Sequence, residues 1–348
     1  MQRLRPFVLP PNYVTQAYTS GGISARFRGV DPAQQSSPED WVASVTTRWG
    51  LAPAGLTRLP DGRLLASAIE EDPEGFLGPE HVARSGNDPG LLVKLLDAAE
   101  RLVVHAHPDD AFASRHLGCA HGKTEAWIVI ATASDDEGEV FAGFTRTVSL
   151  AELAAWVAER SAHEMLACLH RIPVRAGAAV LVPAGVPHAV GAGVLILELQ
   201  QPTDFSIMLE RRSPDGGDLG LGWDLALEAV DRGAWSPARL AELIGPGTSA
   251  AGRVLPEIAD PFFRADLVRA TPNTRLEPGF AVAVGVAGSG ELRGEFPGSP
   301  VPIGRGTTVL IPHGAGSVAV AGAVEIVLCR PAAPDGDPRP PRPEPRTG

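Results

Sequence analysis

The chain has 348 residues, of which 44% are hydrophobic, and this is enough for two domains that each bury a core. Its 41 acidic and 30 basic side chains leave a net charge of -11, and no run of Lys and Arg could follow a phosphate backbone. The composition therefore excludes a nucleic-acid partner and is that of an ordinary soluble protein.

The cysteines and the N-terminus indicate the compartment. Cys119, Cys168 and Cys329 are widely spaced and form no CxxC pair, which favours a reducing environment. The N-terminal sequence MQRLRPFVLPPNYV has too short an apolar run for a signal peptide. No segment approaches the roughly eighteen apolar residues of a membrane span. We therefore expect a cytoplasmic protein with no membrane partner.

Short apolar runs bounded by glycine and proline recur along the chain. Such runs are typical of β-strands in a sandwich or barrel. In chain order they are AWIVIAT, AAVLVPAG, VLILELQ, AVAVGVAG, TTVLIPHG and VEIVLC. The fold is therefore predicted to be mainly β.

A few helices are expected between these runs. Ser149 and Glu152 form a capping box at the start of SLAELAAWVAERSAHEMLACLHRI, whose apolar residues have helical spacing. Ser236 as N-cap and Pro237 at the first helical position predict a helix in SPARLAELI. Together with GWDLALEAV, this predicts a helical connector over residues 216–247.

One stretch of sequence occurs twice. IPVRAGAAVLVPAGVPHAV, from Ile172, aligns with VPIGRGTTVLIPHGAGSVA, from Val301, at an offset of 129 residues. We therefore predict one β-rich unit used twice, as a pair of similar barrels. His188 aligns with Ser317, so chemistry that depends on His188 belongs to the first copy.

The repeat predicts a division of the chain into four parts. The first barrel, with an N-terminal extension and the functional site, takes residues 1–215, and the helical connector follows. The second, degenerate barrel takes residues 248–331. The Pro-rich segment 332–348 cannot bury a core and is expected to be a disordered tail.

Histidines and a carboxylate occur at spacings that suit a metal ion. His105 and His107, in VVHAHPDD, face the same side of an extended segment. Imidazole is the commonest metal ligand. Glu125, at the start of EAWIVIAT, and His188, in PAGVPHAV, are the candidates to complete the site. Three nitrogens and one carboxylate oxygen suit zinc, iron or manganese.

Lysine is rare in this chain, since Lys94 and Lys123 are the only lysines among 30 basic residues. A buried lysine can release its proton near neutral pH, whereas arginine cannot. Lysines beside the histidine cluster are therefore modest evidence for amine chemistry. The alternative is that both are ordinary surface residues.

Four stretches follow one another within about residues 40–210: EDWVAS, PGLLVKLLDAAERLVVHAHPDD, GKTEAW and VPAGVPHAVGAGVLILELQQPTD. Together they resemble, in order, segments of the type I mannose-6-phosphate isomerases, which are zinc enzymes of the cupin superfamily. The resemblance implies a bicupin fold of two jelly-roll-like β-barrels with a few helices, and a metal in the first barrel.

The resemblance also implies roles for individual residues. The family commonly has glutamine where this chain has His105, so Fe²⁺ or Mn²⁺ stays possible beside Zn²⁺. Lys123 matches a lysine beside the reacting carbons, Glu198 an acidic residue of the acid-base chemistry, and Lys94 another active-site lysine. Glu198 could instead be an ion-pair partner at the rim. The implied ligands of one zinc ion are His105, His107, Glu125 and His188.

Two positions depart from the family pattern. Val103 stands where the family has a serine that helps to hold the substrate phosphate, and Met208 where it has an arginine near the sugar phosphate. Both changes remove donors that a phosphate dianion needs. Arg211 and Arg212 are candidate replacements.

The expected function is a metal-dependent aldose-ketose isomerase that works through an enediol. Its substrate is a small-molecule sugar or sugar phosphate, mannose 6-phosphate or a related sugar, and the protein is a monomer or small homo-oligomer. Two alternatives stay open: a metal-dependent cupin oxygenase, and a non-catalytic sugar-binding cupin.

Overall fold

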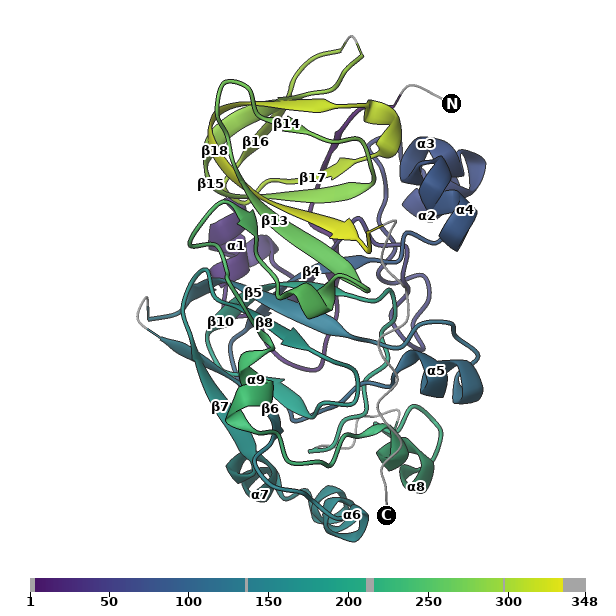
Figure 1. Ribbon diagram of the computed structural model, residues 1–348, viewed down its shortest axis with the longest axis vertical. Helices are drawn as coiled ribbons and strands as arrows, with labels where there is room; N and C mark the ends of the chain where they lie inside the picture. Colours follow the sequence, from purple (N-terminus) through teal and green to yellow (C-terminus); the bar gives the residue numbers. More distant parts are fainter. Residues whose placement is uncertain (1–3, 135–136, 211–215, 297, 334–348) are drawn as a thin grey trace.

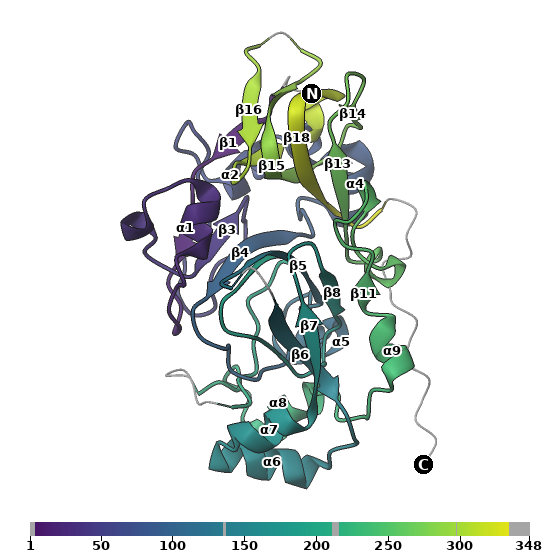
Figure 2. The ribbon, with the colours of Figure 1, turned by 90° about the vertical axis from the view of Figure 1, so that its left-hand side faces the viewer.

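The structure, a computed structural model, describes residues 4–134, 137–210, 216–296 and 298–333. In these residues antiparallel strands form three sheets, with short helices around them (Figure 1). The sheet of eight strands lies at one end of the molecule, and the sheets of seven and three strands lie at the other (Figure 2). The prediction of a mainly β fold with a few helices is confirmed.

The seven-stranded sheet carries most of the candidate site. Its strand order is β11-β8-β5-β10-β4-β3-β2. The central strands β4 and β10 are buried along their whole length, as expected for continuous apolar runs. The strands are β2 (Tyr13–Val14), β3 (Glu39–Val42), β4 (Leu92–Ala98), β5 (Glu125–Thr132), β8 (Ala179–Val182), β10 (Val194–Gln200) and β11 (Ile244–Gly245).

The three-stranded sheet has the order β7-β6-β9 and comprises β6 (Gly138–Phe144), β7 (Leu169–Val174) and β9 (His188–Val190). A separate apolar cluster joins this sheet to the two helices that follow β6, through Phe144 and Trp156 among others. These helices are α6 (Leu150–Glu159) and α7 (Ala162–Ala167).

The eight-stranded sheet follows the order β1-β17-β15-β18-β13-β12, with β14 on β18 and β16 on β15. The largest apolar cluster includes Leu95 and Ile196 of the seven-stranded sheet and Val282 and Val327 of this one, so one core joins the two. The strands are β1 (Phe7–Leu9), β12 (Gly252–Arg253), β13 (Phe263–Arg269), β14 (Arg275–Leu276), β15 (Ala281–Arg293), β16 (Val301–Gly304), β17 (Thr308–Ile311) and β18 (Val318–Pro331).

The repeated sequence adopts the same local structure in both copies. Strands β8 and β17 occupy equivalent positions of the repeat. Each follows a turn whose glycine has a positive φ, 91° at Gly177 and 83° at Gly306. L-residues rarely adopt this conformation, so the turn explains the repeated glycine.

Gly306 provides a test of this turn. A Cβ at this position would lie 2.0 Å from the carbonyl oxygen of Phe27, whereas a Cβ at Gly29, also at positive φ, would meet nothing within 4 Å. We expect Gly29→Ala to lower the free energy of unfolding by about 1–2 kcal/mol, the cost of the left-handed backbone. Gly306→Ala should lower it by more than about 3 kcal/mol, since it adds a clash with backbone. Chemical denaturation of both variants measures the difference, and equal losses would contradict this account.

Strand pairing crosses the predicted division of the chain at two places. Strand β1 pairs with β17 in the eight-stranded sheet, although β1 lies in the first predicted part, residues 1–215, and β17 in the second predicted barrel. Strand β11, at the end of the predicted connector, pairs with β8. The boundaries at residues 215 and 247 therefore stay a prediction. The tail predicted from residue 332 lies outside the described residues from 334 onward.

The prediction of one helix through residue 172 missed a break at Arg160 and was wrong after residue 167. Ser149 accepts a hydrogen bond from the Glu152 backbone N–H as expected, but α6 ends at Glu159, and its C-cap Arg160 has a positive φ of 57°. After α7 the residues LHRIPV form strand β7 and are buried in near alternation. This period of two favours pairing with β6 over a continued helix.

Residues 216–247, predicted as a helical connector, contain α8 (Trp223–Ala226), a 3₁₀ turn at Leu227–Ala229 and α9 (Pro237–Ala241) and end in strand β11. The remaining α-helices are α1 (Ile23–Arg28), α2 (Leu65–Glu71), α3 (Pro73–Leu77), α4 (Pro79–Ser85) and α5 (Asp110–His116). Further 3₁₀ turns occupy Pro32–Gln34, Glu257–Ala259 and His313–Ala315. Across the described part of the chain, no helix has both the length and the apolar character needed to cross a bilayer.

Candidate active site

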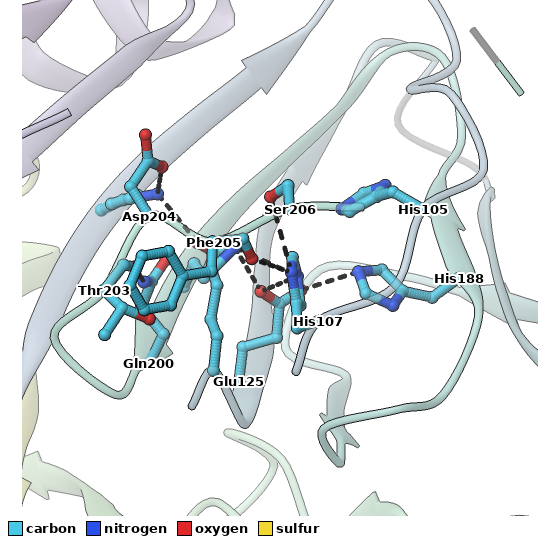
Figure 3. A network of polar contacts seen from close by, with 12 residues as sticks. His105, His107, Glu125, His188, Gln200, Thr203, Asp204, Phe205 and Ser206 are labelled. Atoms are coloured by element: carbon cyan, nitrogen blue, oxygen red, sulfur yellow. Dashed lines mark hydrogen bonds and ion pairs between the residues drawn. The ribbon is translucent and has the colours of Figure 1, made fainter. Parts of the chain in front are cut away.

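Three histidines that are far apart in sequence converge at one point. The ligand nitrogens of His105, His107 and His188 lie within 4.8 Å of one another. A short antiparallel bridge produces this arrangement, because the His105 N–H donates to the His188 carbonyl at 3.0 Å and the His188 N–H donates to the His105 carbonyl at 2.9 Å. His107, two residues after His105, adds the third imidazole (Figure 3).

A backbone carbonyl orients each of these imidazoles. The Nδ1–H of His105 donates to Val103 O at 2.8 Å, that of His107 to Phe205 O at 2.7 Å, and that of His188 to Val186 O at 2.7 Å. Carbonyl oxygens only accept, so the proton is on Nδ1 and each Nε2 presents a lone pair. Metal-binding histidines are commonly held in this way.

Glu125, at the start of β5, adjoins two of the three histidines. Its Oε2 lies 3.0 Å from His107 Nε2, and its Oε1 lies 3.3 Å from His188 Nε2 (Figure 3). Trp127 Nε1–H donates to Oε1 at 2.9 Å, and Lys123 Nζ lies 2.9 Å from Oε2. The three histidines form the group whose ligand atoms all lie close to one another, and Glu125 adjoins this group on one side.

The pKa values of His105, His107 and Glu125 favour two neutral imidazoles beside an ionised carboxylate. Burial, followed by the neighbouring histidines, lowers the pKa of His105 well below its usual range. Burial and then the Lys123 charge lower the pKa of His107 to about 3. Burial alone would raise the pKa of Glu125, but Lys123 and the histidines outweigh it and hold this pKa well below the usual range.

These residues fit a divalent metal ion. His188 Nε2 is buried and has no hydrogen-bond partner among the residues that the structure describes, and Glu125 Oε2 is buried with the Lys123 ammonium as its ion-pair partner. Imidazole lone pairs that face carboxylate oxygens at 3.0 and 3.3 Å repel one another unless a cation lies between them. A buried polar atom without a partner costs about 1–3 kcal/mol. A metal ion bound to His105, His107, His188 and Glu125 would remove both penalties.

A second charged cluster surrounds Lys94 on β4. Its Nζ lies 3.5 Å from Glu39 Oε2, 3.6 Å from Glu198 Oε1 and 3.8 Å from Asp204 Oδ1. Lys94 pairs directly with Glu198 across β4 and β10 and with Trp41 across β3 and β4. The ammonium also lies 4.4 Å from the centroid of the Trp41 ring, a favourable cation–π position.

Lys94 and Glu198 in this cluster differ in how firmly they hold a proton. Burial lowers the pKa of Lys94, but Glu39, Glu198 and Asp204 outweigh it and raise the pKa, so this lysine keeps its proton. Burial and then the Glu125 charge raise the pKa of Glu198 to about 7. Glu198 can therefore gain or lose a proton near neutral pH. Lys94, in contrast, provides a fixed positive charge and not a free amine.

The two clusters open into one cavity of about 330 Å³. His105, Lys123 and Glu125 line it on the metal side, and Lys94, Glu198 and Asp204 line it as well, while His107 and His188 lie buried behind. All seven residues singled out from the sequence are thus brought to one place. A cavity of this kind, with convergent polar groups and perturbed pKa values, is the expected form of a small-molecule site.

Sequence reasoning missed two carboxylates of this site. Glu39 on β3 accepts hydrogen bonds from Tyr18 and Trp41, at 2.8 and 2.7 Å, and Asp204 accepts one from the Trp49 backbone N–H. Both lie in stretches that carry the family resemblance, EDWVAS and QQPTD, and this was the available signal.

Val103 and Met208, the two positions that depart from the family pattern, both line the cavity. The suggested replacements Arg211 and Arg212 lie outside the described residues.

Removing the Lys94 charge should destabilise the protein strongly. Lys94→Met leaves the buried Glu39 and Glu198 and the partly buried Asp204 without their cation, and a broken buried pair costs about 3–5 kcal/mol. The double variant Lys94→Met, Glu39→Gln removes one of these charges and should recover part of the loss. Denaturant unfolding of the two variants measures this, and a loss below about 1 kcal/mol in the single variant would show that the cluster contributes little.

Comparison with known proteins places this site in context. No family model matches the chain. The chain is 31% identical over 212 residues to a mannose-6-phosphate isomerase of Streptococcus mutans, covering 59% of this chain and 61% of the relative. It is 35% identical over 144 residues to mannose-6-phosphate isomerase ManA of Bacillus subtilis, covering 40% and 44%. The aligned regions thus span less than two thirds of these relatives.

Solved structures extend the likeness to the whole fold. The crystal structure of the mannose 6-phosphate isomerase from Bacillus subtilis aligns with a TM-score of 0.71 at 22% identity, covering 94% of this chain and 100% of that one. The apo form of the enzyme from Salmonella typhimurium aligns with a TM-score of 0.70 at 16% identity, covering 96% and 100%. The expectation of a mainly β fold is confirmed by these alignments, and the chain is similar in fold to solved mannose 6-phosphate isomerases and, over part of its length, in sequence to proteins of that name.

Proposed function

We propose that this chain is a metal-dependent aldose-ketose isomerase that interconverts mannose 6-phosphate and fructose 6-phosphate or a closely related pair. The main support is the arrangement of two groups in one cavity: a set of ligand atoms that needs a cation, and a carboxyl group, Glu198, whose pKa is raised to about 7. The relatives named mannose-6-phosphate isomerase support the same reaction.

The proposed metal ligands are His105, His107, Glu125 and His188. Zinc is the first choice, and iron or manganese suits the same donor set. When bound, such an ion supplies positive charge that stabilises the oxyanion of an enediol. We place the site in the first of the two proposed barrels, residues 1–215, with the connector at 216–247 and the second barrel at 248–331.

The side chains around the proposed metal site have separate roles in proton transfer, substrate binding and positioning. Ionised Glu198 accepts the proton from C2 of the aldose and delivers a proton, exchangeable with solvent, to C1, while the hydroxyl proton of O2 is lost and O1 gains one, so that the ketose forms without net change in protons. Lys123 donates to Glu125, and its other N–H groups can donate to a sugar oxygen when a metal ion takes the His107 Nε2 lone pair that Lys123 faces here. Lys94 fixes Glu198 in position and balances its charge.

The test is isomerisation by protein loaded separately with zinc, manganese and iron. We expect conversion of mannose 6-phosphate to its ketose and, in D₂O, deuterium at C1 of the product. Oxygen consumption by the iron form without isomerisation would favour an oxygenase. Tight sugar binding without turnover by any metal form would favour a binding protein, and either result would refute the proposal.

A further inference from the structure

The loop after β3 places a cation and an aromatic ring at the cavity. Arg48 and Trp49 both line it, together with the metal cluster and Lys94. Arg48 is half-buried, and Trp49 is 41% exposed, one of the few large apolar side chains on the surface of the described residues. Neither residue has a role in the proposed proton transfer.

Local hydrogen bonds hold this loop in position. The Arg48 N–H donates to Ala54 O at 2.7 Å, and the Leu51 N–H donates to Arg48 O at 3.0 Å, so the loop closes on itself at Arg48. At its base, Gly55 packs so closely on Trp41 that a Cβ would lie 2.6 Å from that ring. Arg48 therefore has a fixed backbone position before any ligand binds.

Trp49 ties the loop to the metal side of the cavity. Its backbone N–H donates to Asp204 Oδ2 at 3.1 Å, and its ring packs edge-on against Phe205 at a centroid distance of 5.0 Å. The Phe205 carbonyl in turn orients His107. The exposed indole is therefore held beside the cavity, where it can pack against the apolar face of a sugar.

The other cations of the cavity are already paired. Arg101 makes a bidentate ion pair with Glu210, with nitrogen–oxygen distances of 2.8 and 2.6 Å. Lys94 has three carboxylates around it, and Lys123 pairs with Glu125. Arg48, by contrast, has no ion pair or side-chain hydrogen bond within the described ranges of the chain. Of the described cations that line the cavity, Arg48 therefore has the guanidinium that is free to bind an anionic group.

We infer that Arg48 binds the phosphate of a phosphorylated aldose while Trp49 packs against the sugar. This loop thereby provides the phosphate contact that the side chains of Val103 and Met208 do not offer. The inference rests on the proposed function, since it names the substrate class of that same site. A guanidinium suits a phosphate because it offers paired donors with a fixed charge. Glu100 also lines the cavity, but it is exposed and its repulsion is screened by solvent.

Steady-state kinetics with mannose 6-phosphate and with unphosphorylated mannose test this assignment. Arg48→Gln should raise KM for mannose 6-phosphate by about 10- to 100-fold, the value of a charge-assisted contact, and leave kcat nearly unchanged. The KM of Arg48→Lys for mannose 6-phosphate should lie between those of the wild type and Arg48→Gln. The kcat and KM for mannose should not change in Arg48→Gln, whereas Trp49→Ala should raise KM for both sugars to the same extent. Arg171→Gln, at an exposed residue of β7 outside the cavity, removes the same charge and should match the wild type.

The outcome can be separated from that of the proposed function. If no metal form isomerises either sugar, the proposed function fails, and calorimetric titration of the metal-loaded protein with mannose 6-phosphate decides the role of Arg48. Affinity that falls about 10-fold or more in Arg48→Gln, with unchanged thermal unfolding, supports the assignment. Equal KM or affinity in the wild type and Arg48→Gln, or no binding by the wild type, overturns it.

Discussion

Glu198→Gln is expected to lower kcat by about 100- to 10,000-fold while the metal content stays at the wild-type level, because positioned proton transfer contributes a factor of this size. Glutamine has nearly the same shape but cannot accept the proton from the sugar carbon. Glu198 lines the cavity beside Lys94 and contacts no proposed metal ligand through a hydrogen bond or ion pair in the described residues. The measurements are the isomerisation rate and the metal stoichiometry of the same preparation.

The pH dependence gives a second measure of this role. A base acts when ionised, and the pKa of Glu198 is raised to about 7, so kcat/KM should fall as the pH falls through that region. The residual activity of Glu198→Gln should be flat there. Glu159→Gln, the same change at an exposed residue of α6, should keep the wild-type rate and profile. A wild-type rate in Glu198→Gln would remove this carboxyl group from the mechanism.

His188→Ala is expected to abolish metal binding and, with it, all isomerase activity. This imidazole is fully buried, its Nε2 has no hydrogen-bond partner among the described residues, and its Nδ1 is held by Val186. Its removal leaves three of four donors and an unfilled space. Metal analysis after dialysis against a weak chelator should show at least a 10-fold loss of affinity, the lower end of what supporting residues of metal sites contribute.

His105→Gln is the matched control for this prediction. The related family commonly has glutamine at this position, and His105 is the least buried of the three histidines. An amide oxygen can replace the imidazole nitrogen as a donor, so metal should be retained, although the preference among zinc, iron and manganese should change. Full metal retention by His188→Ala, confirmed to be folded by its thermal unfolding, would refute the proposed ligand set.

Local patterns in the sequence were sufficient for the strands and for the identity of the chemical groups. Runs such as VLILELQ predict a buried strand because every position is apolar except Glu198 and Gln200, and β10 forms there. The spacing of His105 and His107 places two imidazoles on one side of the chain, and both reach the cluster. The offset repeat predicts two related units because each glycine turn requires the same positive φ.

Local patterns were not sufficient where a distant partner decides the conformation. Residues 169–174 have helix-forming neighbours, yet they form β7 because β6 offers an unpaired edge. Strand β1 joins the eight-stranded sheet at the far end of the sequence for the same reason. Such choices depend on which edges become available after the chain has folded, and no short window contains this information.

The sequence by itself determined the mainly β fold, and it predicted the kinds of ligand and the seven side chains that the structure brings together at one cavity. The tertiary structure alone decided their electrostatics: that Glu39 and Asp204 join Glu198 around Lys94, that Lys94 keeps its proton, and that Arg48 lines the cavity with no side-chain partner among the described residues. The physical reason is that hydrogen-bonding types and strand periods are local properties, whereas burial and the distances between charges arise only when separate strands pack together.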